Sequence, residues 1–320
     1  MHPDYFSAAP SHATGVSRRA LVRLVGATAW AVPALPASWL LAGCASGSPA
    51  PQAWATGGTA RIDAAVRNTN PFLDAAATTC RLACEATIGP CHTLSPERAD
   101  ISDGWDGLPM HVQLRIVDEQ CRPVQGAIVE IWHTNHTGGY SGHIVQMCNN
   151  DQADVKRQFF RGWQRTDAQG VVRFDSCFPG WYRGRANHVH LRVLKGDYDP
   201  SDAAASWLTS QLMFPDALNT EIFGSAPLYR DHGQPDTTLA TDNVLGAEPD
   251  PSPYLFDVRN AGGVMLASKT LAIRSSLEAS VCQARGTPPP GGPGGPGGRA
   301  GPAPGGFGRP PRMPRPASQD

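Results

Sequence analysis

One short stretch, residues 178–193 (FPGWYRGRANHVHLRV), carries side chains that could bind and use a metal ion. His188 and His190 are two residues apart, and alternate residues of a β-strand face the same side, so both imidazoles are expected on one face. Tyr182 and Arg185 add a phenol and a guanidinium just before this strand. A His-x-His pair alone is more often an ordinary strand face, and Pro-Gly-x-Tyr alone is commonly a turn. Their combination within so few residues favours a metal site.

Short strands separated by turn residues must position these side chains. Alternation of apolar and polar residues, or short apolar runs ending at turn signals, predicts them. The expected strands cover residues 112–116, 127–132, 171–174, 188–193 and 210–214. Helical periodicity is weak, and its best short candidates are residues 203–208 and 72–84. This pattern is typical of an all-β sandwich with few short helices and long loops.

The skeleton of this sandwich by itself suggests no catalysis. The order P-V-x-G-A-x-V-E-I-W (123–132), T-D-x-x-G-x-x-x-F (166–174) and P-G-x-Y (179–182) resembles the transthyretin-like, or prealbumin-like, β-sandwich. That module often serves as a non-catalytic spacer or binding domain. An extracytoplasmic binding lipoprotein is therefore one hypothesis for the chain. Such a module needs neither the His-x-His pair nor Tyr140, which two glycines deliver at the exit of a strand, where functional side chains are frequent.

A second and more specific resemblance involves four sequence blocks. They are V-E-I-W-H-x-x-x-x-G-x-Y (129–140), R-G-x-Q-x-T-D-x-x-G (161–170), P-G-W-Y-x-G-R-A-x-H-V-H (179–190) and Q-L-x-F-P (211–215). In order and spacing they resemble the intradiol ring-cleavage dioxygenases, which include catechol, protocatechuate and hydroxyquinol dioxygenases, and above all the exported branch of that family. The resemblance covers roughly residues 84–235.

The resemblance implies a mononuclear non-haem Fe(III) held by Tyr140, Tyr182, His188 and His190. These residue types suit that ion, because phenolates are hard, anionic donors that favour ferric iron, whereas two histidines and one carboxylate suit Fe(II) oxygenases. Two phenolates and a hydroxide also balance the charge of the ion, which lowers the cost of holding it in a β-sheet core. A copper or zinc enzyme using the two histidines and a further histidine is the rival metal hypothesis.

The activity implied is insertion of both atoms of O₂ into a catechol-type diol. The ring opens between the two hydroxyl-bearing carbons and gives a cis,cis-muconate. By analogy with the family, Tyr182 is released when substrate binds and then acts as a base, Arg185 stabilises negative charge on the ring, and Gln211 supports Arg185. The expected partners are therefore a catechol-type aromatic substrate and O₂.

Several positions depart from the family pattern. Arg183 stands where exported relatives commonly carry proline, Asn187 where a small or apolar residue is usual, and Met213 where an aromatic is frequent. Near the expected substrate mouth, Ile88 replaces an acid and Cys91 replaces an aromatic residue. None of these is a predicted ligand, so they bear on substrate choice and not on iron binding. The remaining histidines are expected to be surface groups or to support the site from outside the ligand set: His92, His111, His133, His136, His143 and His232.

The N-terminal segment has the pattern of an export signal. Arg18 and Arg19 precede an apolar run, residues 24–41, that contains no acid or base and ends just before Cys44. This is typical of a twin-arginine signal followed by a lipoprotein cleavage site, with Cys44 as the lipid-anchored N-terminus of the mature protein. A transmembrane helix is disfavoured, because prolines interrupt the run. We therefore expect a periplasmic or otherwise extracytoplasmic protein attached to a membrane.

Composition divides the chain further. The expected parts are a signal peptide (residues 1–43), a flexible tether (44–68), a dioxygenase-like β-sandwich domain (69–282) and a disordered Gly/Pro/Arg-rich tail (283–320). The whole chain carries a formal charge of −1, and between residues 44 and 282 acidic residues outnumber basic ones by 26 to 19. A nucleic-acid partner is therefore not expected.

Besides Cys44, the expected mature protein has seven cysteines: Cys80, Cys84, Cys91, Cys121, Cys148, Cys177 and Cys282. An exported protein meets an oxidising compartment, so disulfides are expected. Because seven is odd, at most three can form and one thiol must remain. A zinc site at Cys80, Cys84 and Cys91 is the weaker alternative, since their spacing fits no common zinc motif.

Overall fold

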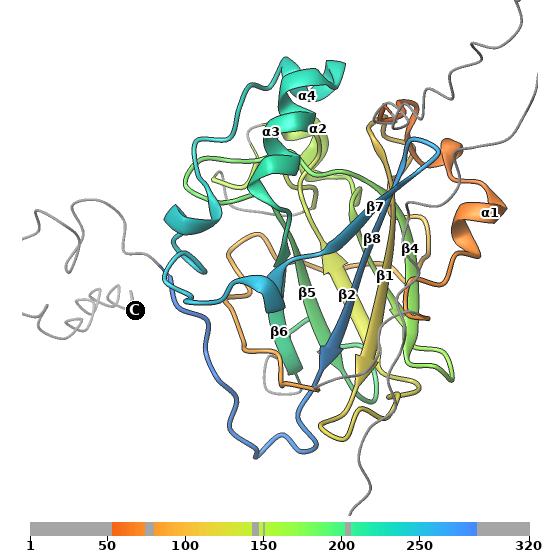
Figure 1. The fold of residues 1–320 in the computed structure, drawn as a ribbon, viewed down its shortest axis with the longest axis vertical. Coiled ribbons are helices and arrows are strands. Elements are labelled where there is room, and N and C mark those ends of the chain that lie inside the picture. The colour runs from red at the N-terminus through yellow and green to blue at the C-terminus, as the bar shows by residue number, and fades with distance from the viewer. Residues whose placement is uncertain (1–52, 74–79, 143–146, 150, 202–205, 287–320) are drawn as a thin grey trace, which may run out of the picture. The chain divides into compact units, whose positions relative to one another are not determined.

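Two four-stranded β-sheets form the fold (Figure 1). A computed structural model of the chain describes residues 53–73, 80–142, 147–149, 151–201 and 206–286. The first sheet has the order β4 (Val171–Cys177), β1 (Pro109–Val117), β8 (Val264–Ala272) and β7 (Asp257–Ala261). The second sheet has the order β3 (Arg161–Arg165), β2 (Ile128–Trp132), β5 (His188–Leu194) and β6 (Ser206–Met213). The predicted all-β sandwich is confirmed.

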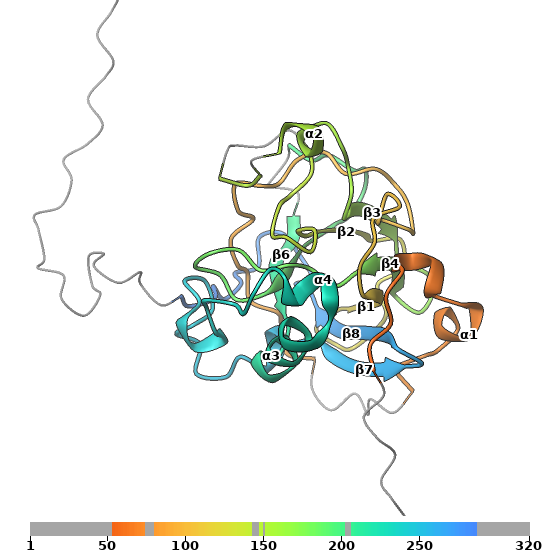
Figure 2. The same ribbon diagram turned by 90° about the horizontal axis from the view of Figure 1, so that it is seen from above.

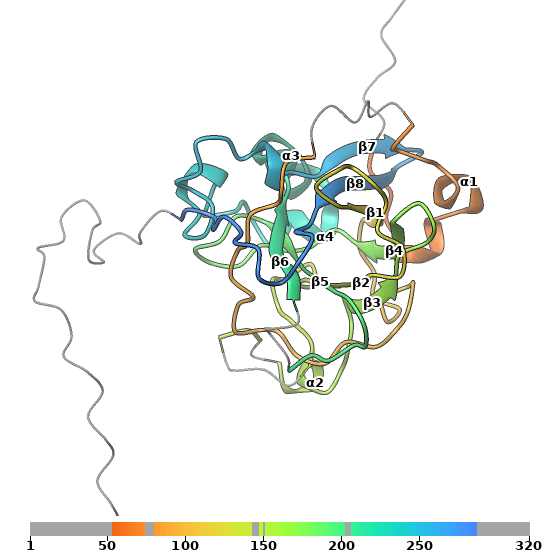
Figure 3. The same ribbon diagram turned by 90° about the horizontal axis from the view of Figure 1, so that it is seen from below.

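The hydrophobic core lies between the two sheets, which Figure 3 shows as two layers. Val112 and Leu114 of β1 contribute from one sheet, and Val189, Leu191 and Val193 of β5 contribute from the other. Each of these side chains is almost completely buried, and burying one contributes about 1.5–3 kcal/mol. Since alternate residues of β5 fill the core, its histidines face away from it, as the two-residue spacing predicts.

The helices are short and lie outside the sheets, with α2 on the side of the second sheet and α3 and α4 above the strand ends (Figure 2). They are the α-helices α1 (Ala64–Arg67), α2 (Gln152–Val155), α3 (Asp216–Ser225) and α4 (Pro227–Arg230), and the 3₁₀-helices η1 (Gly58–Arg61), η3 (Leu239–Thr241) and η4 (Ser252–Tyr254).

Both predicted helical candidates are wrong where the structure describes them. Trp207 and Leu208 belong to β6, while residues 203–205 lie outside the described part. At the end of the 72–84 candidate, Leu82 forms a bridge with Ala272 and no helix is present in its described residues. In both places pairing with a sheet outweighs weak local helix propensity.

Strand β8 escapes prediction from the sequence although it pairs parallel with the central strand β1. Its first five residues are all buried, so apolar residues do not alternate with polar ones. One face of β8 packs into the main core, and its other face, through Val264 and Leu266, is covered by Ile62 and Val66. A strand buried on both faces lacks the two-residue period by which strands are recognised.

The segment that covers β8 corrects the expected extent of the folded region. Residues 58–67, within the segment expected to be a tether, form η1 and α1. Asp63 caps α1 by accepting from the Val66 amide at 2.9 Å, and Arg67 pairs with Asp175 of β4 at 2.7 Å. The folded region therefore begins before residue 69.

Three disulfides join distant parts of the chain, as the cysteine count predicts. They are Cys80–Cys121, Cys84–Cys282 and Cys91–Cys148. The zinc alternative is wrong, because each of its three cysteines bonds to a different distant partner. Cys177 is the remaining thiol, and its burial raises its pKa to about 12, which leaves it unreactive in the folded protein.

Several predictions fall on residues that the structure does not describe. These are the signal segment (1–43), Cys44, His143 and the tail from residue 287 onward. Within the described ranges, no helix has the length and hydrophobicity to cross a lipid bilayer.

Candidate metal centre

The histidines of β5 direct their side chains to one point. The Nε2 atoms of His188 and His190 lie 3.1 Å apart, and the Tyr182 hydroxyl is 3.3 Å from Nε2 of His188. Nδ1 of His188 lies 2.7 Å from the carbonyl oxygen of Ala186, to which it can donate a proton. That hydrogen bond leaves the Nε2 lone pair of His188 free to bind a cation.

Packing orients the second imidazole. In the sheet, His190 is paired with Trp132 of β2 on one side and Gln211 of β6 on the other. Its ring stacks on Trp132 with 4.9 Å between centroids and 8° between planes. Gly89, at φ 75°, covers the ring, and a Cβ there would lie 3.1 Å from Cε1 of His190. A side chain at position 89 would therefore push this imidazole out of place.

Tyr140 enters the site from the loop that follows β2. Gly138, at φ 83°, makes the close turn, since a Cβ at that position would collide with the carbonyl of Trp181. The Tyr140 side chain is 1% exposed, and its ring lies 5.8 Å from that of Tyr182. Its hydroxyl has no hydrogen-bond partner among the described residues. A buried hydroxyl without a partner is costly, and a bound cation would remove that cost.

The protonation of the four groups suits a highly charged metal. Burial lowers the pKa of His188 to about 3 and that of His190 well below its usual value, so both imidazoles are neutral and able to ligate. Burial also raises the pKa values of Tyr140 and Tyr182, so each phenol needs a cation to ionise at neutral pH. One buried phenol and one partly buried phenol beside two neutral imidazoles therefore fit Fe(III).

The other histidines do not join this group. His111 bonds Asp175 at 2.7 Å and His133 bonds Ser176 at 2.8 Å, and both rings are buried, so these two are not surface groups and lie outside the ligand set. His92 is bound to the buried carboxylate of Glu130. Across the described part of the chain, no three or more His, Cys, Asp or Glu residues are placed to hold a metal. Among the described histidines, no third one therefore joins His188 and His190 in a three-histidine copper or zinc site.

Arg185 is held on several sides next to the ligands. Its Nε donates to Oδ2 of Asp242 at 2.9 Å, its Nη2 donates to Oε1 of Gln211, and its Nη1 lies 3.5 Å from the Tyr182 hydroxyl. Gln211 in turn donates to the carbonyl of Thr87 at 2.8 Å. The guanidinium is 7% exposed and therefore has little freedom to leave this position.

Asp242 is an important residue that the sequence analysis missed. It is completely buried, and besides Arg185 it accepts hydrogen bonds from the backbone amides of Ala186, Val244 and Leu245 at 2.8–2.9 Å. The Asp242 carboxylate thus links Arg185 and Ala186 by hydrogen bonds to the segment after η3. No local motif indicates this role, because 57 residues separate Asp242 from Arg185.

A cavity of about 450 Å³ opens onto the candidate metal centre. It is lined by Thr87, Gly89, Pro90, Cys91, Met147, Tyr182, Arg183, Arg185, His190, Asn243 and Val244. The structure thus brings the four predicted ligands, Arg185 and Gln211 together, and Tyr182, Arg185 and His190 of this group line the cavity. Tyr182 lines the cavity and Tyr140 does not, so the two phenols differ in access to a bound molecule.

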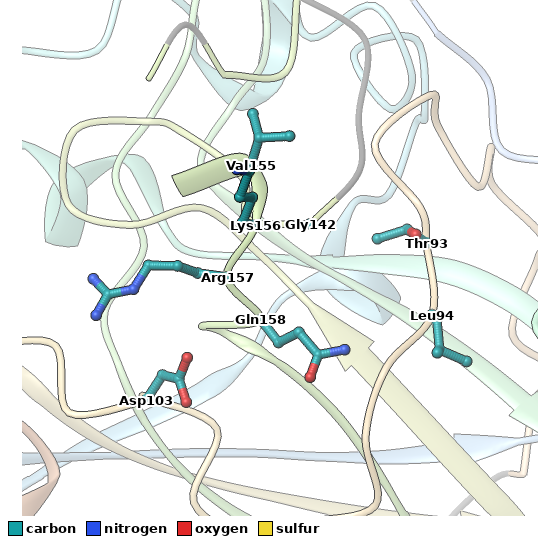
Figure 4. A pocket seen from close by; sticks show the side chains of 8 residues that line it. All are labelled: Thr93, Leu94, Asp103, Gly142, Val155, Lys156, Arg157 and Gln158. Carbon is teal, nitrogen blue, oxygen red and sulfur yellow. The ribbon is translucent and has the colours of Figure 1, made fainter. Parts of the chain in front are cut away.

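A second cavity, of about 480 Å³, is shown in Figure 4. It is lined by Thr93, Leu94, Asp103, Gly142, Val155, Lys156, Arg157 and Gln158. None of the predicted ligands lines it. The candidate chemistry therefore belongs to the first cavity.

A disulfide links the cavity wall to the Tyr140 loop. Cys91 lines the cavity, and Cys148, its partner, accepts a hydrogen bond through its carbonyl from the Tyr140 amide at 2.9 Å. The two sulfurs pack in one buried cluster with Trp132 and Tyr140. In this chain the disulfide therefore occupies the position for which the family pattern has an aromatic residue.

We predict that replacing both Cys91 and Cys148 by serine lowers bound iron at least about threefold, because Tyr140 loses its anchor. The matched control replaces Cys80 and Cys121, which lie outside the cavity. The two bridges span 57 and 41 residues, so chain entropy predicts losses of stability that differ by only about 0.3 kcal/mol. Metal analysis and thermal unfolding of both variants separate the effects, and equal iron content in the two would refute the anchoring role.

Comparison with known proteins agrees with this geometry. Residues 92–215 match a family model described as a dioxygenase, and this range contains all four predicted ligands. The chain is 33% identical over 109 residues to the protocatechuate 3,4-dioxygenase beta chain of Burkholderia cepacia, a match covering 32% of this chain and 42% of that protein. It is 32% identical over 90 residues to catechol 1,2-dioxygenase 2 of Acinetobacter lwoffii, covering 28% and 30%. The matches therefore span less than half of each of these relatives.

A solved structure shares the fold. An intradiol ring-cleavage dioxygenase from Tetranychus urticae superposes with a TM-score of 0.53 at 24% identity, covering 63% of this chain and 99% of that one. The family model matches the stretch that carries the four predicted ligands, and this solved structure shares the sandwich fold. Through residues 92–215 the chain therefore resembles the dioxygenases of this family model, and its fold is that of an intradiol ring-cleavage dioxygenase.

Proposed function

We propose that the protein is a ferric non-haem dioxygenase that cleaves a catechol-type diol between its two hydroxyl-bearing carbons. Both atoms of one O₂ enter the product, a cis,cis-muconate, so no reductant is needed. The observation that carries the proposal is the convergence of the Tyr182 hydroxyl and Nε2 of His190 on Nε2 of His188, at 3.3 and 3.1 Å, with the Tyr140 ring beside Tyr182 and its hydroxyl without a partner among the described residues. When bound, Fe(III) would hold both diol oxygens and make the ring electron-rich enough to react with O₂.

The role of each residue in the proposed reaction follows from whether its side chain reaches the cavity. Tyr182 lines the cavity, so its phenolate can move aside and take a proton from an incoming diol at its Oη. Tyr140 is buried behind it and stays in place with the two histidines. Arg185, held by Asp242 and Gln211, presents a fixed positive charge to the ring as negative charge develops there.

The test is to purify the protein and record its metal content, visible spectrum and oxygen uptake. We expect about one iron per chain, a red-brown colour from tyrosinate-to-iron charge transfer, and consumption of one O₂ per catechol. Bound zinc or copper would overturn the ferric assignment. Iron without any uptake on a panel of catechols would instead favour a binding protein that has kept the cluster without catalysis.

We also propose that the protein is exported by the twin-arginine route and anchored through Cys44. The pattern of residues 18–44 and the three disulfides support this, since disulfides persist in oxidising compartments. Mass spectrometry of the membrane fraction should find lipid-modified Cys44 at the mature N-terminus. An unmodified Cys44 preceded by uncleaved signal residues would contradict the proposal.

A further inference from the structure

The charge of the substrate cavity is distributed unevenly. Two arginines line it, Arg183 and Arg185, and no Asp or Glu does. The guanidinium of Arg185 is already balanced by the buried carboxylate of Asp242 and is hydrogen-bonded to Gln211. Among the described residues, Arg183 is therefore the cavity arginine without an ion-pair partner.

Arg183 is placed by a tight turn between two functional residues. The amide of Arg185 donates to the carbonyl of Tyr182 at 3.3 Å, and Gly184 between them has φ 81°, so Arg183 occupies the first central position of a β-turn. The Gly184 amide is tied to Asp236 at 3.2 Å, and that carboxylate also accepts from Thr237. The backbone of Arg183 is thus fixed at the cavity rim.

The side chain of Arg183, by contrast, has no partner. It is exposed, and it forms no hydrogen bond or ion pair with another residue in the described ranges. A guanidinium presents a planar fork of donors that matches a carboxylate. The Arg183 guanidinium at the mouth of the cavity is therefore available to form an ion pair with an anionic group on a molecule that enters the cavity.

The cavity also has room for more than one aromatic ring. Its volume of about 450 Å³ falls in the range of about 300–1,000 Å³ found for sites that hold drug-sized molecules. Pro90, Cys91 and Val244 supply apolar wall between the metal centre and the rim. A diol bound at the centre could therefore carry a short apolar spacer that ends at Arg183.

We propose that Arg183 forms an anion subsite at the cavity mouth, and that the preferred substrate is a catechol with a carboxylate on a short side chain. The inference rests on the proposed dioxygenase function and deepens it. It concerns Arg183, which is neither a predicted metal ligand nor one of the groups that hold Arg185 in place. The contact between Arg183 and the substrate carboxylate forms when the substrate binds and persists through the reaction. It therefore stabilises the bound substrate and the transition state alike, which lowers KM more than it raises kcat.

The test compares 3-(3,4-dihydroxyphenyl)propanoate with the neutral 4-ethylcatechol. We expect Arg183→Gln to lower kcat/KM for the carboxylate at least about fivefold, mainly through KM, and to change the neutral compound less than about twofold. The preference of the unmodified enzyme should shrink as salt is raised, because the contact is exposed. Arg230→Gln is the matched control, since Arg230 is an exposed arginine on α4 that does not line the cavity.

Charge reversal sharpens the test. Arg183→Glu should invert the preference toward 2-(3,4-dihydroxyphenyl)ethylamine, which carries a cation on a similar spacer. An unchanged carboxylate-to-neutral ratio in both Arg183 variants would overturn the subsite while leaving the dioxygenase function intact. If the protein cleaved neither compound, the proposed dioxygenase function would be wrong. Calorimetry would then measure the affinity of the protein for each of the two compounds. Equal affinities for the carboxylate and the neutral compound would overturn the Arg183 subsite.

Discussion

Loss of the Arg185 guanidinium should reduce oxygen uptake with catechol at least about a hundredfold, the scale of losing one preorganised charge donor. Bound iron and colour should remain, because arginine cannot ligate a cation and the four predicted ligands are untouched. Catechol should still shift the visible spectrum, since charge on the ring grows only as the reaction proceeds. Oxygen-electrode assays and spectra of Arg185→Gln would check both statements.

The structure adds a necessary control to this experiment. Removing Arg185 leaves the carboxylate of Asp242 buried without its cation, and breaking a buried pair in this way typically costs about 3–5 kcal/mol. The double variant Arg185→Gln/Asp242→Asn removes both charges, and the Asp242→Asn change keeps the shape of that side chain. We expect it to regain thermal stability but not activity. Oxygen uptake within about threefold of the unmodified enzyme in either variant would exclude Arg185 from the reaction.

Replacement of Tyr140 by phenylalanine should abolish the red-brown colour and most iron binding. The change removes one oxygen atom from a buried ring and leaves its packing with Trp132 and Tyr182 in place. Because the Tyr140 hydroxyl has no hydrogen-bond partner in the described structure, its removal should leave the free energy of unfolding of the metal-free protein unchanged or slightly raised. Metal analysis and chemical denaturation of the metal-free protein test the two effects separately.

Tyr254 offers a matched control for that variant. Its hydroxyl is also buried without a partner among the described residues, but it packs in a cluster with Met213 and Leu245 that contains none of the four predicted ligands. Tyr254→Phe should therefore keep full iron and colour. Full iron occupancy in Tyr140→Phe would show that Tyr140 is not a ligand, whereas loss of iron from both variants would point to a general effect of removing buried hydroxyls.

Local sequence was sufficient for much of the site. The two-residue spacing of His188 and His190 required only that residues 188–193 form a strand with one buried face, and Val189 and Leu191 supplied that face. Tyr182 lies in the same stretch, and Tyr140 could be added through the sequence blocks that surround it. Each of these inferences depends on neighbours close in the chain, where strand alternation and turn chemistry act.

The sequence by itself thus determined the sandwich class, the candidate ligand set and the number of possible disulfides. Tertiary structure decided which cysteines pair, that β8 is central, that Asp242 holds Arg185, and that Arg183 is left without a partner at the cavity rim. The physical reason is that these features depend on contacts between segments far apart in the chain, such as Cys84 with Cys282, 198 residues away. Burial and charge balance at such contacts arise only when the sheets and loops pack, and no local period or motif encodes them.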